Sequence, residues 1–380
     1  MRQWPKIALG DVLCRSSEPA VCMPDAEYDE VTIRLWGKGV ISRGKVRGAD
    51  VTTPRRVVRA NQLILSKIDA RNGAIGLVPQ ELDGAIVSND FPSFEFADNR
   101  QLDPAFMGWM VRSRHFVDLC KAASEGTTNR VRIKEDRFLA QQIVLPPLTE
   151  QQTIVSRLDT LADKVRQVNK HLDAIERDAE WLLAVQYNDL CRDSDPRDLG
   201  ALLTPSTEYV ALELDEEYEE ITIRLWGKGI VSRGRLLGSQ IRSARRLLSD
   251  NQLVFSKIDV RHGAIGIVPQ VLAGAVVSND FPSFDIDNNK ITTEFLSYIV
   301  SSEGFINRCK EASSGTTNRV RLSEGTFLRL TVPVPSLKRQ RTFDALQAKV
   351  TELKARHATI RQANDALIPA TLERVFSEAH

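Results

Sequence analysis

Residues 145–190, LPPLTEQQTIVSRLDTLADKVRQVNKHLDAIERDAEWLLAVQYNDL, decide how the chain is organised. Apolar residues recur there at alternating steps of four and three, the period of a coiled-coil seam held for about four heptads. They are Ile154, Leu158, Leu161, Val165, Val168, Leu172, Ile175, Ala179 and Leu182. Thr149, Glu150 and Gln152 supply helix-start signals directly after two prolines. A helix of about 40 residues would be about 60 Å long, which predicts a rod that needs a partner helix from the same chain.

The chain is also a tandem repeat, because whole motifs return after a constant offset. Three of them are IRLWGKG at 33–39 and 223–229, SKID at 66–69 and 256–259, and VSNDFPSF at 87–94 and 277–284. Residues 28–94 and 218–284 share 42 identities in 67 aligned positions. A second heptad pattern follows the second copy, at Phe343, Leu346, Val350, Leu353, His357, Ile360, Asn364 and Leu367. The order predicted is globe, rod, globe, rod, with the two rods paired as an antiparallel coiled coil of pseudo-twofold symmetry.

Each globe is predicted to be of the α+β class. In the first copy, short apolar and β-branched runs bounded by Gly, Asn and Asp indicate strands at 31–35, 63–66, 74–78 and 84–87. An amphipathic pattern indicates one helix at 104–123, and a last strand at 142–145 ends at two prolines. The expected domains are a first globe at 1–148, a central helix at 149–190, a second globe at 191–336 and a C-terminal helix at 337–380.

The composition is typical of a soluble protein with ample core. Of 380 residues 42% are hydrophobic, and the mean hydropathy is −0.24. No apolar run approaches a membrane span, and the N-terminal residues lack a signal-peptide pattern. The five cysteines include no CxxC pair, which disfavours a disulfide framework or a zinc site and favours a reducing cytoplasm. Cys120 and Cys309 lie inside helical patterns, where core packing is expected.

Catalytic motifs are not found in the sequence. Residues 37–44, GKGVISRG, lack the third glycine of a dinucleotide fingerprint, and no P-loop pattern occurs. Residues 89–94, NDFPSF, are only faintly like the N-P-P-[YF] motif of amino-methyltransferases. Asp69, Asp90 and Glu135 lie near lysines but match no firm nuclease spacing. We therefore expect no catalytic residue, cofactor or metal in this chain.

Positive charge is concentrated in two segments, although the formal net charge is only +1. Residues 31–80 contain ten Lys or Arg against two Asp, and residues 221–270 contain nine against two. The compensating acids lie elsewhere, for example at 213–220. Two such segments would suit two surfaces that face a polyanion. Arginines in ordinary solvated loops would give the same counts. The sequence of the loops must therefore distinguish between the two interpretations.

Three polar loops recur in both globes, beginning in the first copy with WGKG at 36–39, SKIDARN at 66–72 and GTTNRVR at 126–132. Arg and Asn can bond base edges bidentately, while Thr and backbone amides suit phosphates. Turn chemistry would explain any one loop, but their recurrence beside basic segments favours contact with nucleic acid. The predicted DNA-binding residues are Lys38, Arg43, Lys67, Arg71, Asn72, Thr127, Thr128, Asn129, Arg130, Arg132, Lys228, Arg233, Lys257, Arg261, His262, Thr316, Thr317, Asn318, Arg319 and Arg321.

These features together resemble the specificity (S) subunit of type I restriction–modification enzymes, over essentially the whole chain. The resemblance rests on LPPLTEQQTIV at 145–155, its weaker echo VPSLKRQRTF at 334–343, and SKIDARNGAIGLVP at 66–79 with its copy. It implies that each globe is a target recognition domain that reads one half of a bipartite site in double-stranded DNA. It also implies that the rods fix the gap between the half-sites and dock partners.

The resemblance places the chemistry in those partners. Two methylation subunits would carry S-adenosylmethionine and methylate adenine N6, and a motor-nuclease subunit can join them. Family members usually carry two unlike recognition domains, whereas the globes of this chain are near copies. We therefore hypothesise two closely related half-sites in an interrupted, near-palindromic target.

Two other readings use the same residues. A recognition module of another phage-defence system, or a solitary DNA-binding protein, would need the same globes, and neighbouring genes would separate these from the first reading. A coiled-coil scaffold whose globes bind protein predicts weak, salt-insensitive association with DNA. Several Lys or Arg contacts to phosphates predict instead a steep fall of affinity with salt.

Overall fold

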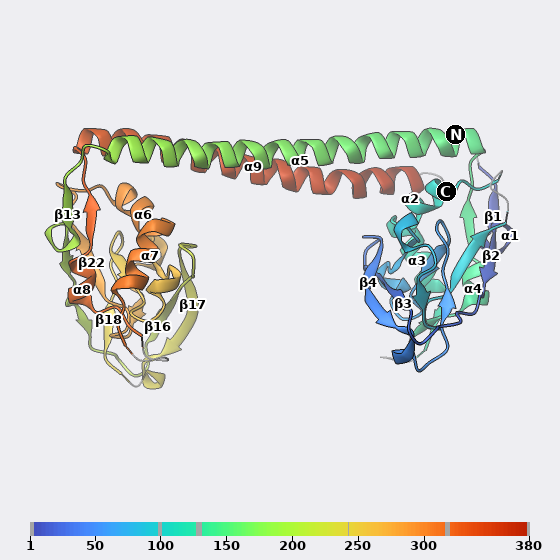
Figure 1. Cartoon of the computed structure of the whole chain (residues 1–380), viewed down its shortest axis with the longest axis horizontal. Helices are drawn as coiled ribbons and strands as arrows, with labels where there is room; N and C mark the ends of the chain where they lie inside the picture. The colour runs from blue at the N-terminus through green and yellow to red at the C-terminus, as the bar shows by residue number, and fades with distance from the viewer. Residues whose placement is uncertain (1–3, 98–100, 127–130, 242, 316–319, 378–380) are drawn as a thin grey trace. The chain divides into compact units, whose positions relative to one another are not determined.

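The computed structural model describes residues 4–97, 101–126, 131–241, 243–315 and 320–377. The chain divides into two compact units. Unit 1 contains residues 1–172 and 357–380, and unit 2 contains residues 173–356. Each unit therefore combines one globe with a part of each long helix (Figure 1).

The globe of unit 1 is built on two four-stranded sheets. One has the order β2–β9–β6–β7, formed by Leu13–Ser16, Ser93–Phe96, Leu63–Leu65 and Ile75–Leu77. The other has the order β4–β3–β8–β5, formed by Val40–Arg47, Glu27–Ile33, Ile86–Val87 and Arg56–Val57. Two short antiparallel pairs join β1 (Lys6–Ala8) to β12 (Gln142–Val144) and β10 (Ser124–Glu125) to β11 (Arg132–Ile133). The predicted strands are confirmed, although β3 begins earlier than expected.

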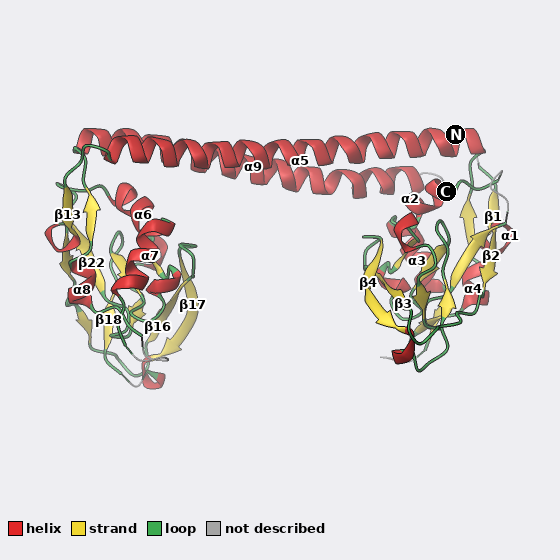
Figure 2. Ribbon diagram, viewed as in Figure 1, coloured by secondary structure: helices red, strands yellow, loops and turns green. Residues whose placement is uncertain are grey.

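Unit 2 repeats this plan. Its four-stranded sheet has the order β14–β22–β19–β20, formed by Leu203–Pro205, Ser283–Ile286, Leu253–Phe255 and Ile265–Ile267. Its five-stranded sheet has the order β15–β18–β21–β16–β17, formed by Tyr209–Val210, Arg245–Leu247, Val276–Val277, Glu217–Ile223 and Ile230–Leu237. Strand β13 (Pro196–Asp198) pairs with β23 (Thr331–Pro333). The helices and strands within each globe confirm the α+β class (Figure 2).

Each globe has one large and one small hydrophobic core. In unit 1 the large core continues into the long helices through Leu158, Leu372 and Phe376, and the small core lies under the β3–β4 sheet. Unit 2 has the same two cores. Cys120 and Cys309 are fully buried in the large cores, and burial raises the pKa of each thiol to about 12. Their predicted packing role is confirmed.

The single helix predicted at 104–123 is wrong, because the chain breaks into two helices there. The helices of the globes are α2 (Pro104–Met110) and α3 (Arg114–Ala122), α6 (Thr293–Ser301) and α7 (Glu303–Ala312), and the short α1 (Leu9–Val12), α4 (Glu135–Leu139) and α8 (Glu324–Leu328). Ser113 caps α3, since its hydroxyl accepts a hydrogen bond from Phe116 N at 3.2 Å. Ser302 caps α7 in the same way. A capping serine starts a new helix despite the continuous apolar period.

The two predicted rods are present as α5 (Leu148–Cys191) and α9 (Leu337–Ser377). Within each unit the two helices run antiparallel, because contacts that advance along α5 retreat along α9. In unit 1 Asn169 bonds Asn364 (3.0 Å), and Leu158 lies in the same hydrophobic core as Leu372. In unit 2 Glu180 pairs with Lys354 (2.6 Å) and Asp189 O accepts from Arg339 (3.4 Å). The predicted antiparallel pairing is therefore confirmed, whereas the pseudo-twofold relation stays a prediction.

Each rod carries two apolar stripes, and pairing buries only one. The buried stripe includes Leu158 and Leu172 on α5, and Phe343, Val350 and His357 on α9. The other stripe leaves exposed Val168, Ile175 and Leu182 on α5, and Ile360 and Leu367 on α9. The prediction that all of these form one seam is wrong. Late in α5 the buried residue is Leu183 and not Leu182, because 3.6 residues per turn drift away from a strict heptad stripe.

The start of each rod is fixed by one fully buried glutamine. In unit 1, Gln151 Oε1 accepts a hydrogen bond from Asp103 N at 2.8 Å. Its Nε2 donates to Gln101 O at 2.7 Å and to Pro146 O at 2.8 Å. Gln340 repeats this in unit 2 with Thr292 N (2.8 Å), Lys290 O (3.0 Å) and Pro335 O (2.7 Å). The amide therefore ties the beginning of each rod to the beginning of a globe helix.

Candidate nucleic-acid interface

A tryptophan is held out into solvent at the tip of one hairpin in each globe. Trp36 follows β3 and has 67% of its surface exposed, and Trp226 follows β16 with 65% exposed. Both residues have positive φ angles, 60° for Trp36 and 63° for Trp226. A bulky side chain rarely adopts this backbone conformation, which costs about 1–3 kcal/mol and persists only where the surroundings enforce it. Strain and exposure together, in both copies, mark this loop as functional.

Backbone contacts to the next loop enforce this conformation. Trp36 N donates to Asn72 O and Gly37 N donates to Gly73 O, each at 2.9 Å. Gly73 itself has a φ of +77°, and a Cβ added there would lie 3.0 Å from the Trp36 backbone. The second copy has the matching bonds, from Trp226 N to His262 O at 2.7 Å and from Gly227 N to Gly263 O at 3.0 Å. The glycine is therefore required for the two loops to meet.

The cations next to the tryptophans remain available to a ligand. Lys38 and Lys228 are exposed and have no ion pair among the described residues. Arg71 and Asn72 lie on a 3₁₀ turn, Ala70–Asn72, and are half-buried. Asn72 Nδ2 donates to Asp69 Oδ1 at 3.3 Å. In unit 2 the matching turn, Val260–His262, places the His262 ring 6.2 Å from the Trp226 ring, centroid to centroid.

Arg261, on this turn in unit 2, carries an unsatisfied donor. Its Nε is buried and has no hydrogen-bond partner among the described residues. A buried donor without a partner is costly, but this nitrogen is enclosed by the globe and is not exposed to a ligand. In the repeat, Arg261 stands at the position of Arg71.

Two of the predicted contact lysines are held by carboxylates of the same globe. Lys67 Nζ lies 2.8 Å from Glu135 Oε1 on α4, and Lys257 Nζ lies 2.9 Å from Glu324 Oε1 on α8. Both lysines are mostly buried. Each carboxylate ties the loop to a short helix and is shared with an arginine, Glu135 with Arg15 at 3.3 Å and Glu324 with Arg246 at 3.4 Å. Any DNA contact of the lysines would have to compete with these ion pairs.

The arginines on the hairpins and in the last loop are also paired, but at the surface. Arg132 Nη1 donates to Asp90 Oδ1 at 2.6 Å, and Arg321 Nη1 donates to Asp280 Oδ1 at 2.8 Å. Arg43 and Arg233 lie only within 4.0 and 3.8 Å of Glu30 and Glu220, respectively. Exposed pairs of this kind contribute little to stability, so these arginines can exchange a carboxylate for a phosphate at small cost.

The three predicted loops of a globe meet at residues 66–74 in unit 1. One side of this segment bonds the tryptophan loop through Asn72 and Gly73. On the other side Lys67 N donates to Asp90 O at 2.8 Å, and Ile133 N donates to Lys67 O at 2.8 Å. Asp90 in turn holds Arg132. Thr127, Thr128, Asn129 and Arg130, with Thr316, Thr317, Asn318 and Arg319, lie outside the described residues.

Sequence reasoning missed the tryptophans as contact residues and the carboxylates as partners of the predicted cations. The sequence did contain a sign of the tryptophans' role, since a Trp begins the polar WGKG loop in both copies. The carboxylate partners could not be found from the sequence, because Lys67 and Glu135 are brought together only by folding. Among the described residues no group of three His, Cys, Asp or Glu could hold a metal ion. In the same part of the chain, no helix has the length and apolarity to cross a membrane.

Comparison with known proteins identifies a family for the first part of the chain. Residues 2–177 match the family described as Type I restriction modification DNA specificity domain, and no curated protein sequence matches the chain. The HsdS subunit from Thermoanaerobacter tengcongensis has 18% identity and a TM-score of 0.60, over 98% of this chain and 96% of that one. A structure described as showing complex assembly and conformational transition of the type I R-M system has 18% identity and a TM-score of 0.70, over 99% of this chain and 98% of that one.

At these identities the two structures show a shared fold. The same sequence motifs and the same sheets return in unit 2, outside the matched residues. Residues 2–177 therefore belong to the family of type I restriction modification DNA specificity domains, and the second part of the chain repeats them.

Proposed function

We propose that the chain is the specificity subunit of a type I restriction–modification complex, and that each globe reads one half of a bipartite site in double-stranded DNA. The observation that carries this is the tryptophan loop, present twice, strained, exposed and next to unpaired cations. In a groove of duplex DNA an apolar ring can contact base edges and sugars, and flanking cations bind phosphates. Catalysis and S-adenosylmethionine then belong to partner subunits, with the complex acting in the cytoplasm.

The likeness of the two globes supports related half-sites. Residues 28–94 and 218–284 are identical at 42 of 67 aligned positions, including all of IRLWGKG. Among the described differences, Arg47 is replaced by Leu237 and Asn72 by His262. Arg59 is matched by Ser249 in the second copy. Arg59 donates a hydrogen bond to Glu18 and is therefore held within the globe. We infer an interrupted target whose halves are inverted and nearly the same.

The uncovered apolar stripes of the rods support docking of two methylation subunits. Unit 1 exposes Val168, Ile360 and Leu367, and unit 2 exposes Ile175 and Leu182. These exposed apolar residues lie at heptad positions, which in a complete coiled coil are buried by another helix. They therefore favour a partner whose helices cover them. Each unit offers such a surface, which fits one methylation subunit per unit. A motor-nuclease subunit can then join through these partners.

Leu182→Glu is expected to leave the fold intact and to weaken capture of the methylation subunit by more than tenfold. The side chain is exposed, so a carboxylate costs the free chain little, but it would be buried without a partner in the complex. Pull-down of the co-expressed methylation subunit measures the effect. Asn188→Glu, which adds the same charge at another exposed position of α5, is the control. Equal capture by Leu182→Glu and wild type would contradict docking on this stripe.

The proposed function is tested with the complex purified together with the methyltransferase encoded next to it. Binding to genomic DNA fragments is expected to fall steeply as salt rises, because several phosphate contacts release counterions. Methyl transfer to those fragments is expected to require this chain. DNA binding without any methyltransferase partner would favour a recognition module of another defence system. Weak binding that does not respond to salt would instead favour a protein scaffold.

A further inference from the structure

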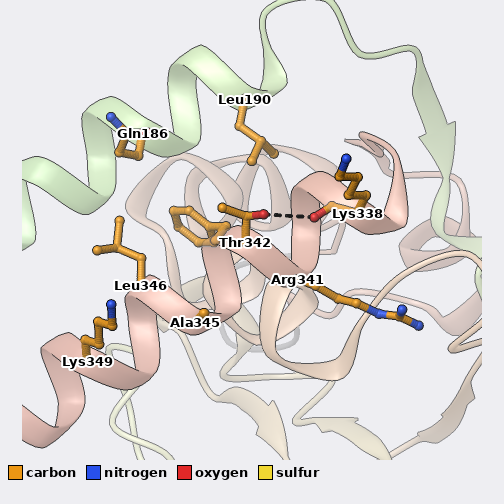
Figure 3. A pocket seen from close by; sticks show the side chains of 9 residues that line it. Gln186, Leu190, Lys338, Arg341, Thr342, Ala345, Leu346 and Lys349 are labelled. Atoms are coloured by element: carbon orange, nitrogen blue, oxygen red, sulfur yellow. Dashed lines mark hydrogen bonds between the residues drawn. The ribbon is translucent and has the colours of Figure 1, made fainter.

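A cationic groove with an apolar floor lies between α5 and α9 within unit 2. It has a volume of about 760 Å³ and is lined by Gln186, Leu190, Lys338, Arg341, Phe343, Leu346 and Lys349, among others. Figure 3 shows Leu190 on α5 and Leu346 on α9 on either side of the space between the helices. Lys338 and Lys349 stand at its two ends, and Arg341 extends outward from the same helix.

The charges of this groove are unsatisfied. Lys338, Arg341 and Lys349 are exposed, and none forms an ion pair within the part of the chain that the structure describes. Thr342 is occupied locally, since its hydroxyl donates to Lys338 O at 3.0 Å. The floor of the groove is well packed, because Phe343 is buried and its ring centroid lies 6.1 Å from that of Tyr187.

The first copy of the repeat lacks these cations. The positions that match Lys338, Arg341 and Lys349 at the rod's start are Thr149, Gln152 and Thr160, which are uncharged. The buried glutamine is kept at both rod starts, but the floor differs as well, since Ile154 and Arg157 stand at the positions of Phe343 and Leu346. A surface that one copy has and the other lacks is not required for the fold that both share.

We propose that this groove binds one acidic amphipathic helix of a partner protein per chain. Lys338 and Lys349 are eleven positions apart on one helix, or about 16 Å at about 1.5 Å per residue. A helix lying along the groove would place acidic residues about eleven positions apart over these amines and apolar residues between them over Leu190 and Leu346. Helix-in-groove binding of this kind uses an apolar face for affinity and charge for orientation.

Two features separate this partner from those already proposed. DNA would use the cations but would leave the floor of Leu190, Phe343 and Leu346 in contact with a charged backbone. The methylation subunits are proposed to dock on exposed stripes that both units provide, whereas this groove is found in unit 2 and its cations are absent from the first copy. The occupant would therefore bind once per chain, whatever DNA sequence the globes read.

The test uses the full-length chain and a fluorescein-labelled helical peptide of about 20 residues. The peptide has Leu along one face and Glu at positions eleven apart, and a second peptide has Lys in place of each Glu. Fluorescence anisotropy is expected to show one acidic peptide bound per chain, and at least tenfold weaker binding of the basic one. Lys338→Glu/Arg341→Glu/Lys349→Glu is expected to lose at least tenfold in affinity for the acidic peptide. Because these three side chains are exposed, the melting temperature of the triple glutamate variant should match that of wild type. If it does not, the triple alanine variant is used instead.

The matched control is Thr149→Glu/Gln152→Glu/Thr160→Glu, which places the same charges at the same positions of the first copy. It is expected to bind the acidic peptide like wild type. Equal binding of both peptides, two peptides per chain, or equal loss in the control variant would each overturn the proposal. So would a loss of affinity for random-sequence duplex DNA in the groove variant as large as its loss for the peptide, since the cations would then be phosphate contacts.

Discussion

Alanine at both Trp36 and Trp226 is expected to weaken binding to the target DNA by about 100-fold. Burying the exposed ring of each tryptophan in a groove of the duplex contributes about 1.5–3 kcal/mol, and the loop occurs once in each globe. Each single variant should therefore lose about tenfold. The fold should be unchanged, since both indoles are mostly in solvent, and alanine keeps the Cβ, so the strain at the positive φ stays about the same. Fluorescence anisotropy with labelled target DNA measures the change.

Trp181 provides the control for this prediction. It is 68% exposed, as the other two are, but it lies on α5 and not on a globe loop. Trp181→Ala should leave DNA affinity as it is. Phenylalanine at position 36 should retain part of the affinity that alanine loses, because its ring still buries apolar surface against the duplex. Suppose that wild type binds the target DNA and that Trp36→Ala, Trp226→Ala and the double variant bind it equally well. The tryptophan loop would then not contact the DNA, although the proposed function would still hold.

Gln151→Leu is expected to lower the free energy of unfolding of unit 1 by about 3 kcal/mol. Leucine has nearly the same size but offers no polar atom. Asp103 N, Gln101 O and Pro146 O would lose the partner that now lies within 2.7–2.8 Å, and a buried unpaired group costs about 1–3 kcal/mol. Chemical denaturation followed by circular dichroism measures the loss. Gln340→Leu should do the same in unit 2.

Gln152→Leu is the matched control, being the adjacent glutamine of the same motif with an exposed side chain. We expect it to change stability by less than about 0.5 kcal/mol. Equal destabilisation by Gln151→Leu and Gln152→Leu would show that the hydrogen bonds do not fix the rod. The pair also explains the motif, since only the first of its two glutamines enters the globe.

The sequence predicts the plan of this molecule better than its local detail. The 190-residue repeat and the 3.5-residue period both persist over many residues, so the two globes and the two paired helices could be recognised. One capping serine overrides a helical period, which is why the break at Ser113 was missed. The choice between two apolar stripes on α5 depends on where the other helix and the globe lie, which periodicity does not encode.

The candidate interface shows the same limit. Its three loops could be located because each is repeated, but the charge that each residue presents depends on tertiary partners. Lys38 and Lys67 look alike in the sequence, yet Lys38 is exposed and Lys67 is paired with Glu135. The backbone strain at Trp36 follows from a contact with Gly73, on a different loop. Residue type and repetition thus predict the surface, and folding decides which side chains remain free on it.

The most direct test of the central claim is long-read mapping of adenine methylation in cells that express this chain with its neighbouring methyltransferase gene. We predict an interrupted motif with two inverted, closely related halves, which is absent from cells that lack the chain. Replacing residues 28–94 by residues 218–284 should make the two halves more alike, because both globes would then carry the same loops there. Two unrelated half-sites would contradict the proposal that the near-identical globes each read one half. A motif that persists without this chain would contradict the assignment of specificity to it.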